Sequence, residues 1–299
     1  MRHEFTRRIG AVSLMLVALV ATTPSFASTI TTRAFDSPAL QRSWSYVAYL
    51  PTGYDESDLR YPVLYLLHGN GQKGYDWVSA GHIQQTADEL IASGAMPPAI
   101  IVMPDAGTTW FVDRKEEMET AMMQDLIPQI DAKFRTVAAR KGRLVAGLSM
   151  GGYGAMRFAL KYPEAFAAAA LLSPAIYDPV PPQNSSARRV GVFGSPQFDP
   201  EVWKSLNYPA LWDAYLAKQT PVPMYINSGD DDEYFIEADA TRFYSLLRRN
   251  RQPAELRIVN GTHSWPVWSG TIGEALRYIF GFAARPVSAA PAEAERQAD

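Results

Sequence analysis

The sequence predicts one α/β domain whose mostly parallel central sheet is covered by helices on both faces. Short, continuously apolar segments alternate along the chain with amphipathic ones, which is the pattern of parallel strands joined by helices. Residues 28–284 have the length of one large α/β domain, and a hydrophobic content of 47% is enough to fill one core. Reactive groups in such sheets gather beyond the carboxyl ends of the strands, so candidate functional residues are expected there.

The first part of the domain carries the signals of strand, strand, helix and strand. Residues 44–51 (WSYVAYLP) alternate with a period of two, and 61–69 (YPVLYLLHG) and 98–107 (PAIIVMPDAG) are short apolar runs, so all three are predicted strands. Residues 81–94 are amphipathic with a helical period and end in glycine, which predicts a helix.

The middle of the chain predicts a helix, a strand, a second helix and a second strand. Residues 117–134 have a helical period, in which Pro128 predicts a kink or a restart. The apolar run 143–147 (RLVAG) passes directly into a small-residue helix at 151–163, and 166–175 (FAAAALLSPA) is predicted to be a strand.

The last third begins with the one long stretch that has no clear period, 174–208. Its prolines and its length predict a lid or a binding loop rather than a connector. A strand at 224–228, a helix at 238–250 and a strand at 254–261 follow, and a helix at 272–283 closes the domain.

Residues 1–27 have the pattern of a secretory signal peptide and are excluded from the fold. Arginines precede an apolar run of about a dozen residues, and Ser25-Phe26-Ala27 offers a small-x-small cleavage site. The run is shorter than the roughly 20 residues that span a bilayer. We expect export from a bacterial cell, to the periplasm or beyond, by the Sec or the twin-arginine route, with no stable membrane insertion after cleavage. Residues 285–299 lack an apolar period and are predicted to be a disordered tail.

Composition excludes several classes of function. The chain has no cysteine, which excludes a disulfide scaffold, a thiolate metal site and a cysteine nucleophile. A net charge of −3 gives no sign of binding to nucleic acid or to anionic membranes. No metal or organic cofactor is implied, and the oligomeric state cannot be read from the sequence.

Ser149 lies in Gly-Leu-Ser-Met-Gly (147–151), between a predicted strand and a predicted helix. This matches G-x-S-x-G, in which the serine adopts a strained turn and the flanking glycines avoid a Cβ clash. The strain raises the hydroxyl above the sheet edge. We therefore predict that Ser149 is a nucleophile; the alternative is a chance match, which the strand-to-helix context makes less probable.

A serine hydroxyl needs a base to remove its proton, so a histidine is required. The chain has four histidines. His3 falls in the signal peptide, and His68 and His82 precede the serine, whereas this motif is followed by the acid and then by the histidine. His263 is thus the predicted base, and a surface-loop histidine is the alternative.

The acid that orients His263 is expected in SGDDDEYF (228–235), whose three aspartates and Glu233 are the four candidates. We rank Asp232 ahead of Asp230 and Asp231, although spacing alone does not separate them. The run lacks the alternating ligands and the central glycine of a calcium loop, so the alternative is a solvated acidic turn.

Two backbone amides are predicted to bind the oxyanion. The Met150 N–H lies at the start of a helix, where the dipole favours negative charge. The Asn70 N–H lies in LLHGNGQ (66–72), where glycines let the backbone turn inward. His68 is expected to brace this loop rather than to transfer protons, and a plain hairpin is the alternative.

Trp77, Trp110 and Trp265 flank the predicted catalytic loops and are predicted to contact the substrate. The alternative for each is packing in the core. The expected substrate is a small-molecule or carbohydrate-linked ester.

Five motifs in a fixed order resemble the esterase D-like branch of the α/β-hydrolases. This branch includes S-formylglutathione hydrolases, feruloyl and acetyl-xylan esterases, enterochelin-type esterases and mycobacterial mycolyltransferases. The motifs, which cover roughly residues 40–282, are LLHGNG with DW at 76–77, AIIVMPDAG, GLSMGGYGAM, SGDDDEYF and GTHSWPVW.

The resemblance implies the α/β-hydrolase fold and supports three of the site residues. The family's Gly-x-x-Asp acid pattern falls on Gly229 and Asp232, and its oxyanion donors fall on Asn70 and Met150. S-formylglutathione hydrolases carry a cysteine near the catalytic loop, which this chain lacks, so that member is disfavoured.

The expected function is that of an exported serine esterase, which hydrolyses carboxylic esters through an acyl-enzyme. Two alternatives stay open. One is acyl transfer to a sugar or glycerol hydroxyl, as in the mycolyltransferases. The other is a non-catalytic binding module on a hydrolase scaffold.

Overall fold

A computed structural model describes residues 27–288 of the chain. Apart from Ala27, the predicted signal peptide lies outside the described residues, as does the predicted tail beyond residue 288. None of the helices within 27–288 is long and apolar enough to cross a membrane.

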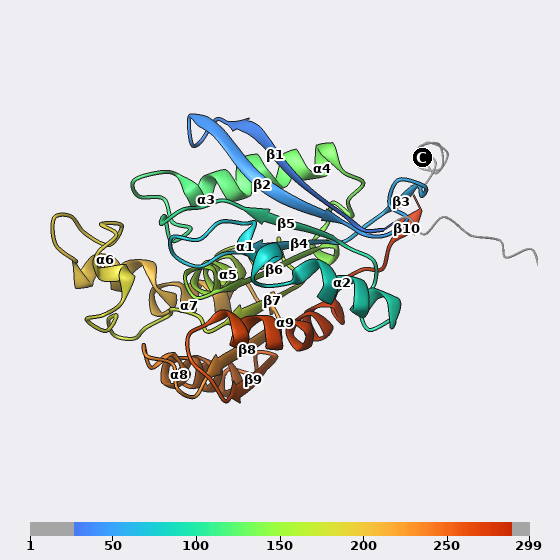
Figure 1. Cartoon of the computed structure of the whole chain (residues 1–299). Helices are drawn as coiled ribbons and strands as arrows, with labels where there is room; N and C mark the ends of the chain where they lie inside the picture. The colour runs from blue at the N-terminus through green and yellow to red at the C-terminus, as the bar shows by residue number, and fades with distance from the viewer. Residues whose placement is uncertain (1–26, 289–299) are drawn as a thin grey trace, which may run out of the picture.

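The centre of the molecule is an eight-stranded sheet with the order β1-β2-β5-β4-β6-β7-β8-β9 (Figure 1). β1 and β5 each pair antiparallel with β2, and all other neighbours are parallel. The mostly parallel sheet of the sequence analysis is thus confirmed. The strands are β1 (Thr29–Ser37), β2 (Arg42–Leu50), β3 (Leu59–Arg60), β4 (Val63–Leu67), β5 (Ile100–Pro104), β6 (Arg143–Leu148), β7 (Ala168–Leu172), β8 (Met224–Gly229), β9 (Ala254–Val259) and β10 (Val287–Ser288).

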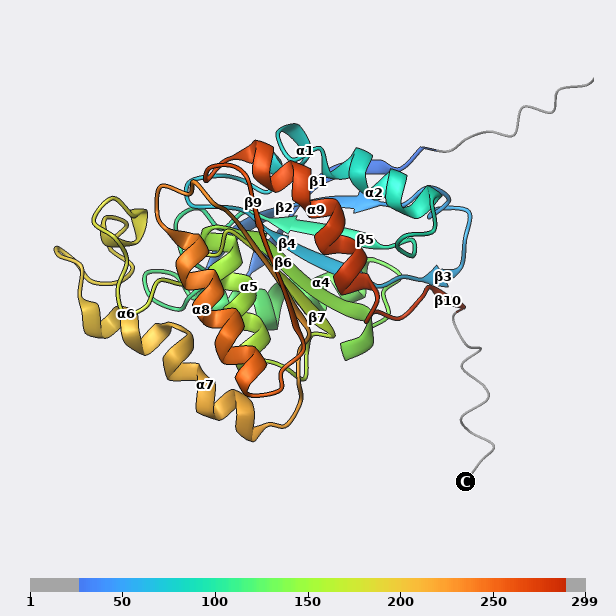
Figure 2. The ribbon, with the colours of Figure 1, turned by 90° about the horizontal axis from the view of Figure 1, so that it is seen from below.

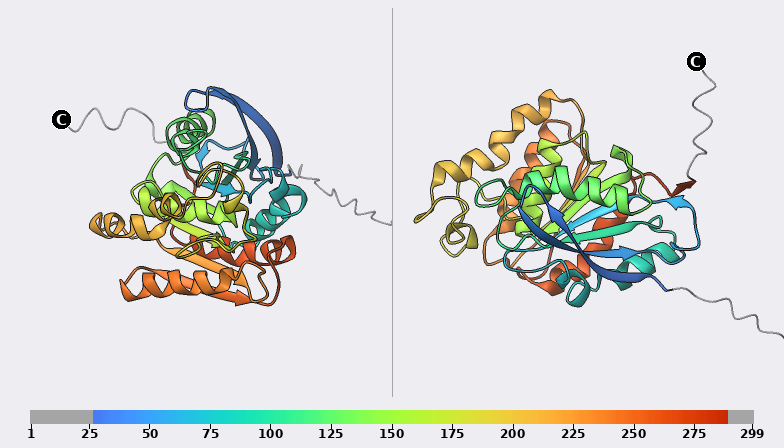
Figure 3. Two further views of the ribbon diagram at one scale, coloured as in Figure 1. Left: turned by 90° about the vertical axis from the view of Figure 1, so that its left-hand side faces the viewer. Right: turned by 90° about the horizontal axis from the view of Figure 1, so that it is seen from above.

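Helices cover both faces of this sheet, and each face has its own apolar core. One core joins the sheet to α2 and α9, and the other joins it to α4, α5, α7 and α8. Figure 3 shows the two sets on opposite sides of the strands. The helices are α1 (Asp76–Ser79), α2 (Ile83–Ala92), α3 (Met118–Thr120), α4 (Ile127–Lys133), α5 (Met150–Lys161), α6 (Pro200–Leu206), α7 (Tyr208–Ala217), α8 (Ile236–Arg249) and α9 (Trp265–Phe280), with a π-helix (Ala121–Leu126) between α3 and α4 and 3-10 turns at Arg140–Gly142 and Ser186–Arg188.

Three helices have in their first turn a proline that the sequence analysis placed in a loop or passed over. Proline is favoured in the first turn of a helix, where its missing N–H needs no partner. Pro200 starts α6 inside the stretch predicted to be irregular, and Pro209 lies in the first turn of α7. Pro266 lies in the first turn of α9, which begins at Trp265, seven residues before the predicted start. Figure 2 shows α6 and α7 at the edge of the domain beside α8.

Pro128 acts as the predicted restart point. The π-helix ends at Leu126, and α4 begins at the next residue with Pro128 in its first turn. A proline ring clashes with the carbonyl four residues earlier, which favours a break in the regular α-helical ladder there.

The chain remains structured beyond the predicted domain end at residue 284. β10 pairs antiparallel with β3, and the Ala284 N–H donates to the Lys141 carbonyl. The assignment of residues 285–299 to a disordered tail is therefore wrong for Val287 and Ser288, whose backbone finds a partner in β3.

Candidate active site

Ser149 lies at a sharp turn between β6 and α5, and its backbone is strained. Its φ of 53° and ψ of −116° are unusual for a residue with a side chain. A Cβ on Gly147 would lie 2.4 Å from the Gly151 carbonyl, and one on Gly151 would lie 2.4 Å from the Leu67 carbonyl oxygen. The steric reason given for the two glycines is therefore present in the structure.

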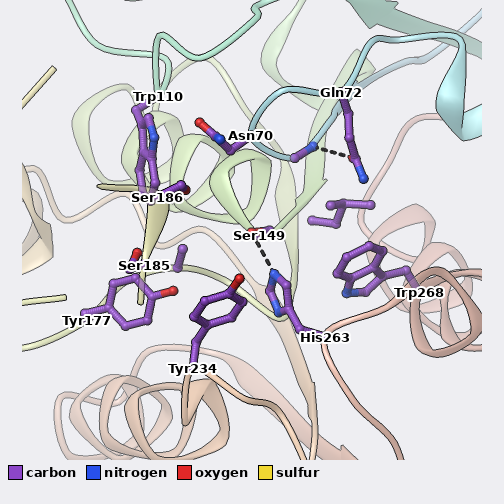
Figure 4. A pocket seen from close by; sticks show the side chains of 13 residues that line it. Asn70, Gln72, Trp110, Ser149, Tyr177, Ser185, Ser186, Tyr234, His263 and Trp268 are labelled. Atoms are coloured by element: carbon purple, nitrogen blue, oxygen red, sulfur yellow. Dashed lines mark hydrogen bonds between the residues drawn. The ribbon is translucent and has the colours of Figure 1, made fainter. Parts of the chain in front are cut away.

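The loops after β8 and β9 bring a carboxylate and an imidazole to this serine. His263 Nε2 lies 2.8 Å from Ser149 Oγ (Figure 4). His263 Nδ1 lies 2.7 Å from Asp232 Oδ2. Asp232 is buried, and its second oxygen accepts a hydrogen bond from the Tyr234 N–H. The three side chains form one continuous hydrogen-bonded chain.

Of the three aspartates left open by the sequence, the structure brings only Asp232 to the imidazole. Asp230 accepts a hydrogen bond from the Gly261 N–H instead. Asp231 is exposed, and its carboxylate makes no hydrogen bond or ion pair within residues 27–288. Spacing could not separate the three because the turn of the loop decides which carboxylate faces inward.

The imidazole of His263 is packed between two aromatic rings. Tyr234 and Trp268 each lie edge-to-face with it, with ring centroids 5.0 Å away. The Trp268 indole N–H donates to the buried Ser173 Oγ at 3.0 Å, which fixes this ring. The sequence analysis did not assign Tyr234 or Ser173 a role, although Tyr234 stands within the acidic motif and next but one to Asp232.

The two predicted oxyanion donors are both free. Among the described residues, neither the Asn70 N–H nor the Met150 N–H donates a hydrogen bond, and Met150 is the first residue of α5. Asn70 lines the same pocket as Ser149. An unpaired amide at a helix start, as at Met150, is suited to an anionic oxygen.

His68 braces the loop that carries Asn70. Its Nε2 accepts a hydrogen bond from the Ala106 N–H at 2.8 Å, and its Nδ1 donates to the Gly69 carbonyl at 2.7 Å. Because Nε2 accepts, the ring is neutral, and burial lowers the pKa of His68. This agrees with a bracing role, since a buried neutral ring with both nitrogens occupied has no free site for proton transfer.

A small pocket opens above Ser149, with a volume of about 160 Å³. Figure 4 shows Trp268 on one side of His263 and Tyr234, Tyr177, Ser185 and Ser186 towards the other. These side chains come from α9, from the loop after β8 and from the segment after β7. The segment predicted to form a lid or binding loop thus supplies one wall.

The three tryptophans predicted to contact substrate have different positions. Trp110 lines the pocket. Trp77 does not, because it is fully buried and its indole N–H donates to the Leu67 carbonyl. Trp265 is also not among the lining residues and packs edge-to-face on Trp77 and Trp268. Trp77 and Trp265 therefore pack against neighbouring side chains, whereas Trp268, which also flanks the predicted catalytic loops, lines the pocket with Trp110.

A metal site is not formed by the part of the chain that the structure describes. Residues 27–288 contain no cluster of three or more His, Asp or Glu side chains that could hold an ion. The polar groups at the pocket are instead arranged around Ser149.

Comparisons with known proteins agree on one family. The family model described as "Putative esterase" matches residues 37–279. An endo-1,4-beta-xylanase/feruloyl esterase of Xylanibacter ruminicola is 40% identical over 141 residues, which is 44% of this chain and 19% of that protein. The chain therefore spans about a fifth of the length of that relative.

Two further proteins match most of the chain. An acetyl esterase of Caldicellulosiruptor saccharolyticus is 24% identical over 82% of this chain and 96% of its own. A solved structure of a ferulic acid esterase superposes with a TM-score of 0.72 at 26% identity, covering 86% of this chain and 99% of that one.

Proposed function

Because the chain belongs to the "Putative esterase" family of α/β-hydrolases, we propose that it hydrolyses carboxylic esters through an acyl-enzyme on Ser149. The observation that carries this proposal is the hydrogen-bonded chain from Ser149 Oγ through His263 to Asp232 at a strained strand-to-helix turn. The named relatives, which are esterases, support the reaction class.

In the proposed mechanism His263 removes the proton of Ser149 as Oγ attacks the ester carbonyl. Asp232 holds the imidazole in the required orientation and stabilises its charged form. The Asn70 and Met150 amides bind the oxyanion of the tetrahedral intermediate. The C–O bond to the alcohol then breaks, and His263 gives its proton to the leaving oxygen.

Deacylation repeats these steps with water as the nucleophile. His263 takes a proton from a water molecule, the hydroxide adds to the acyl carbon, and the Ser149 ester bond breaks with return of the proton to Oγ. The products are a carboxylic acid and free enzyme.

Substitution of the three side chains tests the proposal. Ser149→Ala and His263→Ala are expected to lower kcat/KM for p-nitrophenyl acetate by several orders of magnitude, with Asp232→Asn somewhat milder. Ser205→Ala, an exposed serine on α6, serves as the control and is expected to leave the rate unchanged. Full turnover by Ser149→Ala would contradict the proposal and favour a binding module.

The size of the pocket limits the acyl group. A volume of about 160 Å³ is close to that of an engineered cavity, about 150 Å³, that accommodates benzene. We therefore propose a short acyl chain or a single ring, with the hydroxyls of Tyr177 and Ser185 in the wall favouring a polar group.

A panel of p-nitrophenyl esters of rising chain length measures this limit. We expect kcat/KM to fall steeply beyond about six acyl carbons, since a longer chain exceeds a benzene-sized cavity. Methyl ferulate and acetylated xylan in the same panel compare an aromatic with an acetyl substrate. Equal rates for butyrate and palmitate would show that the pocket does not set the limit.

We also propose export, which the pattern of residues 1–27 supports. When the full chain is expressed in a bacterial host, the protein is expected outside the cytoplasm and should begin at Ser28. N-terminal sequencing of the protein from the periplasmic and culture fractions checks this, and an intact Met1 in exported material would contradict it.

A further inference from the structure

The backbone of His263 is held by a single side chain of the neighbouring loop. Its N–H donates to Glu233 Oε2 at 3.2 Å, the only hydrogen bond of that amide among the described residues. α9 begins only at Trp265, and Ser264 before it makes no side-chain cap. The main chain of His263 is therefore held by this loop contact, in addition to the hydrogen bonds and aromatic contacts that its ring makes.

The rest of the same loop is tied down further back. The Gly261 N–H donates to Asp230 Oδ1 at 2.9 Å, and the Asp231 N–H donates to the Gly261 carbonyl at 3.0 Å. Nearer the histidine, the Ser264 N–H donates to the Thr262 carbonyl at 2.9 Å, so this bond spans His263 without engaging its amide. The Glu233 carboxylate is the group that holds the His263 amide itself, and its loss is expected to loosen the main chain at this position.

The backbone of Glu233 also reaches the opposite wall of the pocket. Its carbonyl accepts a hydrogen bond from Asn184 Nδ2 at 3.1 Å. Asn184 precedes Ser185 and Ser186, which line the pocket (Figure 4). One exposed residue thus connects the histidine loop with the segment that forms the pocket wall.

Resting on the proposed function, we propose that Glu233 is a positioning residue that sets the place of His263 and, through Asn184, couples it to the pocket wall. The residue is exposed, so burial in the core does not account for these contacts. What the histidine loop needs is an acceptor oxygen, which a glutamine also provides.

Three variants test the contact to the histidine. Glu233→Ala is expected to lower kcat for p-nitrophenyl acetate about tenfold or more with KM within about twofold, because a small displacement of the base affects the chemical step. Glu233→Gln is expected to restore kcat to within about threefold of the wild type, since its amide oxygen accepts the same N–H. Asp231→Ala, an exposed neighbour without a side-chain partner within 27–288, is the matched control and should behave as the wild type.

Amide hydrogen exchange measures directly how firmly the histidine loop is held. The amides of residues 260–265 should exchange faster in Glu233→Ala than in Asp231→Ala, while the melting temperatures of the two differ by less than about 3 °C. Asn184→Ala should instead raise KM several-fold at nearly constant kcat, because it loosens the pocket wall at Ser185 and Ser186 and leaves His263 in place.

Two results would overturn the inference. One is wild-type kcat and wild-type exchange in Glu233→Ala, and the other is a Glu233→Gln variant as impaired as Glu233→Ala. Failure of the proposed function looks different: the wild type itself would show no ester turnover above Ser149→Ala.

Discussion

At the scale of single residues, the turn at Ser149 has no space for a methyl group on its helical side. The nearest atom to a Cβ on Gly151 is a carbonyl oxygen of β4, which belongs to the central sheet and cannot move aside. Gly270 in α9 is a useful contrast, since a Cβ there would meet nothing within 4 Å.

Gly151→Ala is therefore expected to destabilise the protein by about 3 kcal/mol or more, with loss of esterase activity. Gly270→Ala should be neutral or stabilise by up to about 1 kcal/mol, because alanine favours the helix. Thermal unfolding of both variants checks the prediction. A Gly151→Ala protein that melts with the wild type would show that the turn relaxes.

Residue-level reasoning predicted those parts of the site that have few candidates. Ser149 is marked by its motif, and His263 is the one histidine that follows it in the chain. The pocket walls were harder, because sequence shows that aromatic residues flank a loop but not which way they point. Trp77 thus lies in the core and Trp268 in the pocket wall, although both stand near the predicted catalytic loops.

At the scale of elements, a buried charge cluster fixes helix α5, which begins directly after Ser149. Glu119 of α3 is fully buried and pairs with Arg157 of α5 at 2.5 Å and with Lys161. Arg157 also donates to the Leu206 carbonyl at the end of α6. α5 is thereby tied to both α3 and the end of α6.

Glu119→Ala should lower the free energy of unfolding by about 3–5 kcal/mol, because it leaves a buried arginine without its partner. Glu201→Ala, which breaks an exposed pair with Lys204, should change it by less than about 0.5 kcal/mol. Urea denaturation of both variants measures the difference. Equal stability of the two would mean that Arg157 finds another acceptor.

Element prediction succeeded where burial gives a clear pattern. The central strands β4, β5, β6, β7 and β8 are mostly apolar and buried almost throughout, and they were recognised because both of their faces are covered. The edge strand β1 is partly exposed along most of its length, so no apolar run marks it. α6 and α7 were missed because their prolines resemble loop prolines until their place in the first turn is known.

At the scale of the whole molecule, stability depends on pH because one buried carboxylate has a raised pKa and another has a lowered pKa. Burial raises the pKa of Asp239 in α8 to about 6. Burial also raises that of Glu119, but Arg157, Lys161 and Tyr162 outweigh it, and the net pKa is lowered. Glu119 therefore stabilises the fold above its ordinary pKa, and this contribution is lost as the pH falls.

Asp239 acts in the opposite direction. Its protonated form is favoured in the folded state, so its contribution is complete below about pH 4 and is lost as the pH rises through about 6. Asp239→Asn keeps an acceptor for the Asp178 N–H and does not titrate. We expect the melting temperature of this variant, relative to the wild type, to rise between pH 4 and pH 7. A constant difference across that range would contradict the raised pKa.

The class of the sheet could be predicted from the alternation of elements, but its strand order and its antiparallel edge could not. A period of two identifies a strand without naming its neighbour, and the pairing of β2 with β5 is decided by contacts between segments far apart in the chain.

The short ribbon of β3 and β10 has a practical consequence for immobilising the enzyme or fusing it to another domain. β3, which pairs with β10, directly precedes the amino end of β4, and β1 runs in the same direction as β5. Both ends of the described chain therefore lie at the amino ends of the parallel strands, whereas Ser149 lies at the carboxyl end of β6. A bead or a carrier domain joined near either of these ends would lie on the side of the molecule opposite Ser149. In an immobilised preparation the pocket above Ser149 should therefore face the solvent, where it can reach substrates too large to diffuse.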